Sequence, residues 1–437
     1  MKGMFDTLIK AFRMPELRKK IMYTLLILAI YMIGGLIPVP GLDREKFTGL
    51  VQNWGQIGSM MDIISGGGLY AATIFAMGIT PYINASIIIQ LLTVVIPSLE
   101  NLAKEGEAGR KKMQKINRFT AIGLAFLQSS LFCWSTKSAM LPNMPKALNA
   151  ALVITCFTAG TCLVVWLGER INEKGIGNGV SLIIFAGIVT RLPAYAQNTY
   201  IKAQEVSGKI PNAVVGTLVG IVTFLAIVAI AIAIIVFVVY VQNAERRIPV
   251  QYSKKTVGRK LYGGQSSYIP LKVNQSGVMP VIFAMSILAL PSMIVTFIAS
   301  ESQNWFVEWC RNFTGSPTYY IFYFLFIVAF TFFYSLIQFN PIEISQNIQK
   351  NGGFIPGIRP GKPTTEYIQK TSSTLNWADA LFLAIVCLVP TLVSALTGLA
   401  DVWFAGTSVL ILTGVANDLV TQIESQLVTR NYRGFLD

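Results

Sequence analysis

The feature that most constrains this chain is a series of apolar runs, each about as long as a helix that crosses a bilayer. A spanning helix needs roughly 20 mainly apolar residues. Only 13% of the residues are charged, about half of the share that a soluble protein carries. The sequence therefore predicts an all-α polytopic membrane protein with about ten transmembrane helices. We expect these helices near residues 21–38, 71–97, 119–137, 148–168, 179–197, 213–241, 277–299, 317–338, 377–397 and 403–423.

The positive charges are distributed unevenly among the connections between these runs. The chain has 35 Lys and Arg residues against 21 Asp and Glu residues. Most of the cations lie before the first run and after the second, fourth, sixth, eighth and tenth runs. Because cytoplasmic connections of membrane proteins are enriched in Lys and Arg, we expect both termini in the cytoplasm. The basic segment 1–20 is expected to form a short amphipathic helix at that interface.

Two short motifs occur twice, at corresponding places in the two halves of the chain. Gly-[Ile/Val]-x-Pro-x-Ile occupies 78–83 and 277–282, in the second and seventh runs. Gly-x-Ser-[Leu/Val]-[Ile/Leu]-Ile occupies 179–184 and 406–411, in the fifth and tenth runs. Two five-helix halves would cross the membrane in opposite senses, and such inverted repeats usually place a pathway at their interface. Ordinary packing is the alternative, because Gly and Pro are common in membrane helices.

The repeated motifs carry aliphatic side chains and no charged ones. If the matched helices face a common axis around a central pore, β-branched residues form its narrowest part. Such residues are stiff, and an apolar constriction is poorly wetted. The ring would bind no ion and would suit a cargo of variable chemistry. Its expected members are Ile79, Ile83, Val180, Ile184, Ile282 and Ile411.

A segment at 60–70, ahead of the second span, is too short and too rich in glycine to cross the membrane. Gly66, Gly67 and Gly68 permit a sharp bend or a hinge. The segment is nevertheless apolar enough to be buried. Two interpretations stay open, an external turn and a re-entrant segment that folds back and closes the pathway.

Two expected cytoplasmic loops are long enough to act outside the membrane. The loop 242–273 contains Arg246 and Arg247 and has apolar pieces on either side of a Gly-Gly pair, which suggests a projecting hairpin. The loop 339–375 presents Arg359 among Pro and Gly residues that fix turns. The cations could serve only to set the topology. On ordered, protruding loops they favour a docking face for an acidic partner or for RNA phosphate.

Signatures of enzymes and metal sites are missing from the sequence. It has no histidine, and its five cysteines lie singly. The run 361–364 lacks the spacing of a phosphate-binding loop. We therefore expect no enzymatic activity, no catalytic residue, no metal and no cofactor. A secondary transporter of a small solute is the alternative function, although it needs polar or ionisable groups near the midplane.

Four longer motifs resemble the SecY family, the channel subunits of the bacterial protein translocon. They are Ile74–Leu92, Glu105–Arg110, Gly175–Ser181 and Gly353–Gly361, and the likeness extends over essentially the whole chain. The resemblance implies a protein-conducting channel of the general secretory pathway, with two five-helix halves around an hourglass pore. Unfolded preproteins would cross through it. Apolar segments would leave sideways into the bilayer between the second and seventh spans, which form a lateral gate.

The resemblance also implies roles for individual residues. The six aliphatic residues correspond to the pore ring of the family, with Val180 in place of the usual isoleucine. Arg359 corresponds to an arginine needed for productive use of the SecA motor, and Arg246 and Arg247 lie in the loop that meets SecA or the ribosome. The segment 60–70 corresponds to the plug. Within it, Met61 and Ile64 stand where other members of the family can have aromatic residues. The expected plug residues are Met61, Ile64, Ser65, Gly66, Gly67, Gly68 and Leu69.

The family further implies partners and a location. The expected partners are SecE, SecG, the SecA motor ATPase, the ribosome, preproteins with their signal peptides, and membrane lipid, with no DNA. The expected location is the bacterial plasma membrane. The resulting organisation is an N-terminal segment 1–20, a first half 21–197 that includes the plug segment, a second half 213–423 with the two cytoplasmic loops, and a cytoplasmic tail 424–437.

Overall fold

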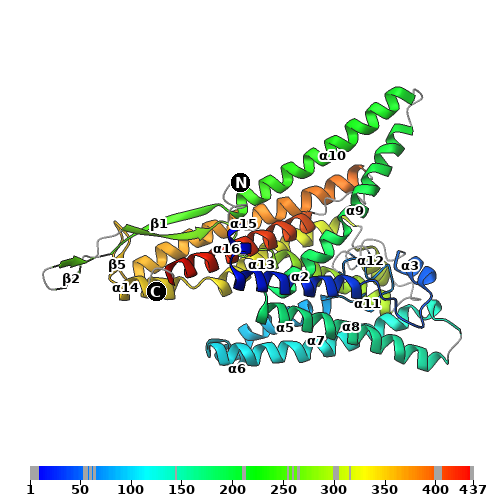
Figure 1. The fold of residues 1–437 in the computed structure, drawn as a ribbon, viewed down its shortest axis with the longest axis horizontal. Helices are drawn as coiled ribbons and strands as arrows, with labels where there is room; N and C mark the ends of the chain where they lie inside the picture. The colour runs from blue at the N-terminus through cyan, green and yellow to red at the C-terminus, as the bar shows by residue number, and fades with distance from the viewer. Residues whose placement is uncertain are drawn as a thin grey trace. The chain divides into compact units, whose positions relative to one another are not determined.

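The computed structural model shows a helical protein with two small β-sheets, one of three strands and one of two (Figure 1). It describes residues 9–52, 58, 62, 65–142, 145–208, 213–252, 255–257, 260–262, 266–298, 305–313, 316–397 and 406–433. The strands are β1 (Glu245–Tyr252), β2 (Lys255–Val257), β3 (Lys260–Tyr262), β4 (Ser266–Lys272) and β5 (Gly353–Phe354). The α-helices are α2 (Pro15–Gly34), α3 (Arg44–Gln52), α5 (Thr80–Val95), α6 (Pro97–Lys104), α7 (Glu107–Ser135), α8 (Lys146–Lys174), α9 (Gly179–Gly208), α10 (Ala213–Gln242), α11 (Met279–Ile298), α12 (Trp305–Asn312), α13 (Pro317–Gln338), α14 (Pro341–Lys350), α15 (Lys362–Thr397) and α16 (Gly406–Arg433).

The chain divides into two compact units. Unit 1 contains Met1–Asn198, Ser286–Tyr319 and Val415–Asp437, and unit 2 contains Thr199–Met285 and Tyr320–Gly414. Unit 1 therefore holds all of the expected first half, whereas unit 2 holds most of the second. Several long helices, among them α9 and α16, pass from one unit into the other.

Each predicted span contains a helix, but four of the helices begin more than three residues from the expected start. The first begins earlier, at Pro15, since proline suits the first turn of a helix. The second begins at Thr80 instead of 71, because Gly78 has a left-handed backbone (φ +53°) and Pro81 lies in the first turn. The third begins at Glu107 instead of 119. The ninth begins at Lys362 instead of 377, so the loop 339–375 is shorter than predicted and is largely structured.

Five helices in the described part are long and apolar enough to cross a membrane, judged by length and composition. The second predicted span, 71–97, ends at a sharp bend, because α5 and α6 meet at an angle of 103°. Pro97 begins α6 and disfavours helical backbone at the preceding residue. If this bent pair counts as one span, six segments meet the criterion. The five are Lys146–Lys174, Gly179–Ile201, Leu218–Gln242, Pro317–Lys350, which includes both α13 and α14, and Lys362–Pro390.

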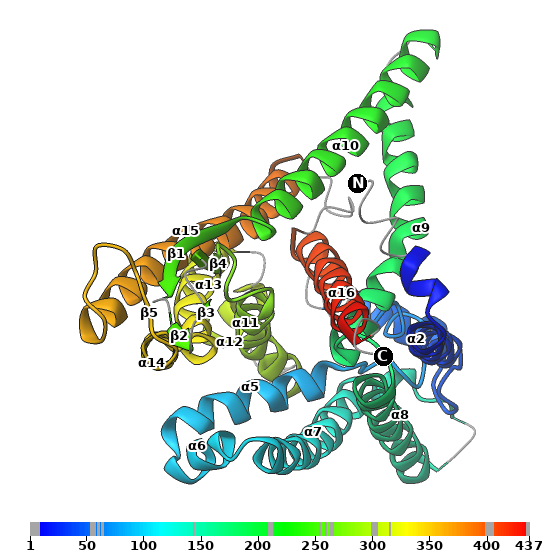
Figure 2. The ribbon, with the colours of Figure 1, turned by 60° about the vertical axis from the view of Figure 1, so that its left-hand side comes forward.

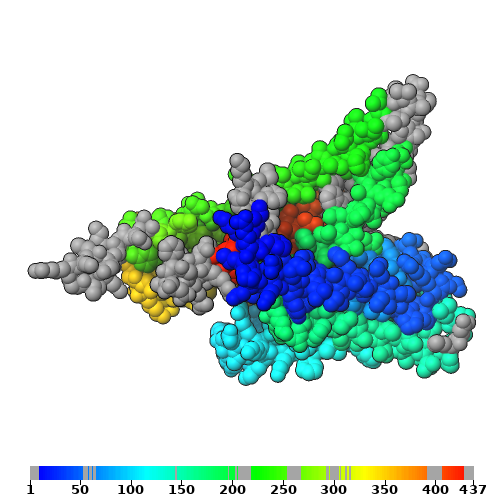
Figure 3. All heavy atoms as spheres, in the orientation of Figure 1, coloured from blue at the N-terminus to red at the C-terminus, as the bar shows by residue number. Residues whose placement is uncertain are grey.

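The outer face of α2 carries large apolar side chains that no element in the described part of the chain covers. Figure 3 shows this helix, in blue, uncovered along much of its length. Leu26 and Ile33 on this face are 58% and 61% exposed. The opposite face is buried, and α2 packs there against α8. Such a helix suits contact with lipid on one side and with protein on the other.

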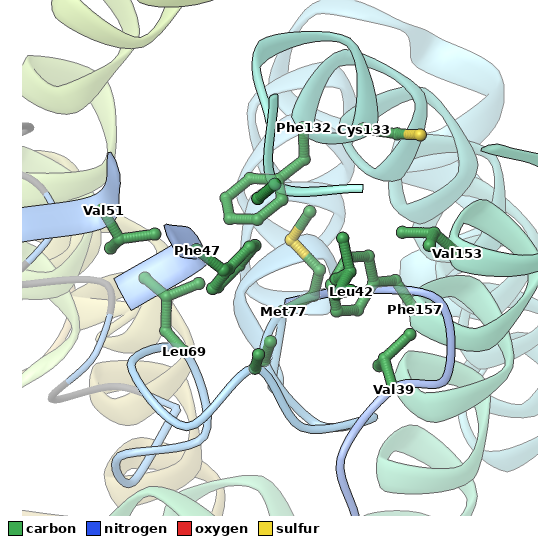
Figure 4. Close-up of a cluster of buried hydrophobic side chains, with 13 residues drawn as sticks. Val39, Leu42, Phe47, Val51, Leu69, Met77, Phe132, Cys133, Val153 and Phe157 are labelled. Atoms are coloured by element: carbon green, nitrogen blue, oxygen red, sulfur yellow. The ribbon is translucent and has the colours of Figure 1, made fainter. Parts of the chain in front are cut away.

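An apolar core lies in unit 1 where α3, α7 and α8 meet the chain around Leu69 (Figure 4). Phe132 of α7 lies between two other rings, 5.6 Å from Phe47 and 5.7 Å from Phe157 between centroids. Leu69 is fully buried in the same cluster. The C-terminal end of the glycine-rich segment 60–70 is therefore packed into the helical core.

In unit 2 the two loops that were expected on the cytoplasmic side meet in one antiparallel sheet of order β4–β1–β5 (Figure 2). The predicted hairpin is confirmed, because β1 pairs with β4 over seven residues, from Glu245↔Lys272 to Gln251↔Ser266. The second loop adds β5 to the other edge of β1 through Gln251↔Phe354. Ile248 and Val250 alternate inward and pack against apolar residues of α14 and α15.

Candidate functional site

The first pair of repeated motifs adopts matching backbone in the two units. Gly78 has φ +53° and Gly277 has φ +66°, and a helix begins two residues after each. The N–H of Ile83 donates to the carbonyl of the residue after Gly78 at 3.1 Å, and the N–H of Ile282 makes the corresponding bond at 3.3 Å. Left-handed backbone favours glycine. The two motifs therefore share a backbone conformation as well as a sequence pattern, so the match is not a coincidence of composition.

The second pair of motifs also matches. Gly179 begins α9, and a Cβ there would overlap the carbonyl oxygen of Gly168 in the preceding helix, α8. Gly406 begins α16, and a Cβ there would overlap the carbonyl oxygen of Val386 in the preceding long helix, α15. Glycine permits this close backbone approach. The fifth and tenth spans thus begin against their predecessors in the same manner.

The predicted ring residues lie at the starts of these matched helices. Ile79 caps α5 and is buried, Ile83 is in its first turn, and Ile184 lies in the second turn of α9. Val180 and Ile282 are half-buried, and Ile411 is buried in α16. The first four belong to unit 1, and the last two belong to unit 2. Their assembly into one ring stays a prediction.

The described part of segment 60–70, the expected plug, folds as a series of turns within unit 1. The N–H of Gly67 donates to the carbonyl of Asp62 at 2.9 Å, and Thr73 donates its N–H to the carbonyl of Gly68 at 3.0 Å. Just beyond, Val39 donates its N–H to Ala72 at 2.9 Å, which bridges the segment to the end of α2. The expected plug residues Met61 and Ile64 lie outside the described residues.

Glycine allows this segment to approach α9 at backbone distance. Gly66 has φ +67°, and a Cβ there would lie 2.8 Å from the Cα of Gly187. The hydroxyl of Tyr31 donates to the carbonyl of Ser65 at 3.4 Å, and its ring stacks on Phe75 at 5.7 Å. The described part of the segment is thus packed on α2 and α9.

Sequence reasoning missed one charged residue at this place. Arg191 lies in the fifth predicted span and forms an ion pair with Asp62. A cation within an otherwise apolar run is the signal that could have pointed to the pair.

A buried polar cluster precedes α11 in unit 2 and was also missed by sequence reasoning. We call it the polar joint, and it consists of Asn274, Gln275, Ser276, Ser372 and Asp379. Asp379 of α15 accepts the hydroxyl of Ser276 at 2.6 Å and its N–H at 3.3 Å. Gln275 accepts the hydroxyl of Ser372 at 3.0 Å, while Asn274 accepts the N–H of Gly277 at 2.7 Å. Asp379 is fully buried. These bonds fix the chain directly before the seventh span.

The three arginines that were expected to dock a partner lie on the sheet of unit 2 and beside it. Arg246 and Arg247 are both exposed on β1. The Nε of Arg247 donates to Glu245 at 2.7 Å, and its guanidinium lies 4.8 Å from the centre of the Tyr268 ring. The bond to the Glu245 carboxylate raises the pKa of Arg247 above its ordinary value. This cation stays charged at any physiological pH.

Arg359 is exposed on a short, ordered connection between β5 and α15. Gly357 and Gly361 on either side have φ +80° and +99°, which form its turns. The carbonyl of Arg359 accepts the hydroxyl of Thr364 at 2.9 Å. Ser345 of α14 donates to the carbonyl of Gly361 at 3.2 Å. The backbone is thus fixed while the guanidinium faces outward.

Comparisons with known proteins agree with this arrangement. The family model described as SecY matches residues 73–420. The chain is 44% identical to the protein translocase subunit SecY of Streptomyces galbus, over 99% of this chain and 100% of that protein. This degree of identity over full length is enough to establish the family.

Two solved structures resemble the fold. A structure of SecY, in which the plug domain is described as stabilising the closed state of the translocation channel, has a TM-score of 0.62 at 20% identity, covering 94% of this chain and 93% of that one. Sec61 in the canine ribosome–channel complex from the endoplasmic reticulum has a TM-score of 0.60 at 18% identity, with the same coverage. The chain belongs to the SecY family.

Proposed function

We propose that this chain conducts unfolded preproteins across the membrane as the channel subunit of a protein translocase. The observation that carries this function is the 44% identity to a translocase subunit over 99% of the chain. The fold agrees, because its structural relatives are ten-helix channels built in two halves. The family is a family of channels and not of enzymes. A multi-pass membrane protein follows from the same relationship.

The pore of this channel is closed at rest by two devices. One is the ring of Ile79, Ile83, Val180, Ile184, Ile282 and Ile411, whose positions at matched helix starts support the assignment. The other is the plug segment 60–70, which is supported by its backbone packing on α9 and α2. Apolar segments of the substrate leave into lipid between the second and seventh spans, α5 and α11. The α11 helix begins directly after the polar joint.

The arginines Arg246, Arg247 and Arg359 form a docking face for a cytoplasmic motor or for the ribosome. Their exposure on ordered β1 and on the fixed β5–α15 connection supports this role. The Sec61 relative is part of a ribosome–channel complex. SecA is the expected motor, and SecE and SecG are the expected membrane partners. On this proposal the chain lies in the bacterial plasma membrane with both termini in the cytoplasm.

A secondary transporter is not supported by these findings. The matched helix starts present aliphatic residues, and the two buried carboxylates that the structure describes near them are both engaged, Asp62 by Arg191 and Asp379 by Ser276. A transporter needs ionisable groups facing its substrate near the midplane. A protein-conducting path needs none.

The test is reconstitution of the complete translocase in vesicles with SecE, SecG, SecA, ATP and a preprotein that carries a cleavable signal peptide. Protection of the preprotein from added protease reports translocation. We expect protection with the wild-type chain and its loss in Arg359→Glu, because the charge reversal repels an acidic motor surface. Lys174→Glu, a reversal at another exposed cation on the same expected side, serves as the matched control and should keep activity.

The outcomes separate the two parts of this proposal. Absence of protection in a correctly assembled wild-type complex with an active motor would contradict the channel function. Equal protection in wild type and Arg359→Glu would keep the channel and remove Arg359 from the docking face.

A further inference from the structure

We propose that Arg191 on α9 and Asp62 in the plug segment form a charge latch that holds the plug in its seat. This inference rests on the proposed function of the segment as a channel plug. It adds two positioning residues, and neither touches the substrate. The ion pair joins Oδ2 of Asp62 to Nη2 of Arg191 within unit 1.

Asp62 holds the whole turn in place, because it bonds to several residues of the turn as well as to Arg191. Its Oδ1 accepts the backbone N–H of Tyr70 at 2.9 Å. Its carbonyl accepts the N–H of Gly67 at 2.9 Å and the hydroxyl of Ser65 at 3.1 Å. The same hydroxyl accepts the N–H of Leu69 at 3.2 Å. The carboxylate therefore links the start of the turn, its end and α9.

The segment is shaped to receive the guanidinium of Arg191. Gly67 has φ +91°, and a Cβ there would lie 2.6 Å from the Nε of Arg191. The ring of Tyr70 lies 5.9 Å from the guanidinium carbon, at the outer limit of a cation–π contact. Arg191 lies one helical turn after Gly187, which meets Gly66 backbone to backbone. One face of α9 thus supplies both the contact surface and the charge.

Because the ion pair is buried, it stabilises the segment only while the segment is in its seat. The side chain of Asp62 is 4% exposed and that of Arg191 is 24% exposed. Removing one partner of such a pair leaves the other charge without compensation in a poorly solvated place. When the segment leaves its seat, both charges are exposed to water and can be hydrated. The latch therefore stabilises the seated state without preventing release by an incoming polypeptide.

The experiment measures resting halide flux through the assembled translocase in vesicles, with a halide-quenched dye inside and no preprotein or motor. We expect Asp62→Asn and Arg191→Gln to raise the flux by roughly 5- to 150-fold, which corresponds to a coupling of about 1–3 kcal/mol. The charge swap Asp62→Arg with Arg191→Asp should bring the flux back toward the wild-type value. Arg170→Gln, which breaks an exposed pair with Glu173 on α8, is the matched control and should leave the flux unchanged.

Two comparisons guard against a purely structural effect. Arg191→Lys keeps the charge, so its flux should stay well below that of Arg191→Gln. Wild-type flux in both single variants would overturn the latch. Equal flux in the lysine and glutamine variants would also overturn it, and so would a folded charge swap that leaks like the single variants.

Preprotein protection is measured on the same vesicles to separate the two proposals. Translocation by the wild type together with unchanged flux in the variants would reject the latch alone. No translocation by a correctly assembled wild type would reject the channel function itself.

Discussion

Two buried aspartates, one in each unit, are held in different ways. Asp62 of unit 1 pairs with the guanidinium of Arg191, a residue of another element. Asp379 of unit 2 accepts a hydroxyl and an N–H from Ser276. The first contact joins two charges, whereas the second joins a carboxylate to neutral donors. Both lie beside segments that the proposed mechanism assigns to gating.

This difference indicates which of the two contacts, that of Asp62 or that of Asp379, can separate more easily. A buried ion pair depends on both partners, and both can be hydrated once they separate. A carboxylate bound by hydroxyl and amide donors can be replaced by an amide that still accepts a hydrogen bond. We infer that the plug segment is held conditionally, whereas the chain ahead of α11 is held permanently.

The largest expected effect comes from removing the backbone contact on which the latch depends. In Gly66→Ala the left-handed backbone costs about 1–2 kcal/mol, and overlap of the new Cβ with Gly187 adds about 1–3 kcal/mol. The resting halide flux should rise, and the thermal unfolding temperature of the complex should fall. Gly49→Ala is the control, since a Cβ at Gly49 meets nothing within 4 Å. If Gly66→Ala behaves like Gly49→Ala, the described seat is wrong.

The next prediction sharpens the comparison of the two aspartates. Asp62→Asn should cost about 2–3 kcal/mol, less than a fully buried pair because Arg191 is partly exposed. Asp379→Asn should cost only about 1 kcal/mol, because the amide oxygen can still accept from Ser276. Glu366→Gln, the same change at an exposed place on α15, is the control. Thermal unfolding of the assembled complex checks the order, and a larger cost at Asp379 would reverse our interpretation.

The smallest expected effect concerns the exposed pair on β1. The pKa of Arg247 is raised by its bond to Glu245. A raised pKa gives stability that is present at low pH and is lost only as pH rises through the folded pKa, far above the working range. Glu245→Gln should therefore change stability and motor binding only slightly, and by the same amount at every pH between about pH 6 and pH 9. Titration of motor binding at several pH values checks this, and a change within that window would contradict it.

Much of the helical architecture could be predicted because apolar runs of fixed length leave few alternatives. The eighth predicted span, 317–338, coincides with α13, and the sixth differs from α10 by one residue. The hairpin of the first loop and the paired glycine motifs were also predictable, since turns and left-handed backbone demand glycine.

The missed features depend on contacts between residues far apart in the sequence. Arg191 and Asp62 are separated by the second, third and fourth predicted spans and by part of the fifth, so composition could not pair them. The long start of α15 was hidden because residues 362–376 are polar, although they form a helix with buried Ile368 on one face. The pairing of β5 with β1 joins two loops that were treated separately.

The most direct test of the central claim is to trap a preprotein during transit and ask what it touches. A photo-crosslinking amino acid is placed at Ile83, at Ile282 or at Ile411, with Ile221 on the exposed face of α10 as the control. A preprotein with a tightly folded C-terminal domain then arrests in the channel. We predict adducts between the arrested chain and each of the three ring positions, and none at Ile221. Adducts at Ile221 alone, or an arrested chain that labels no ring position, would contradict a path lined by these aliphatic residues.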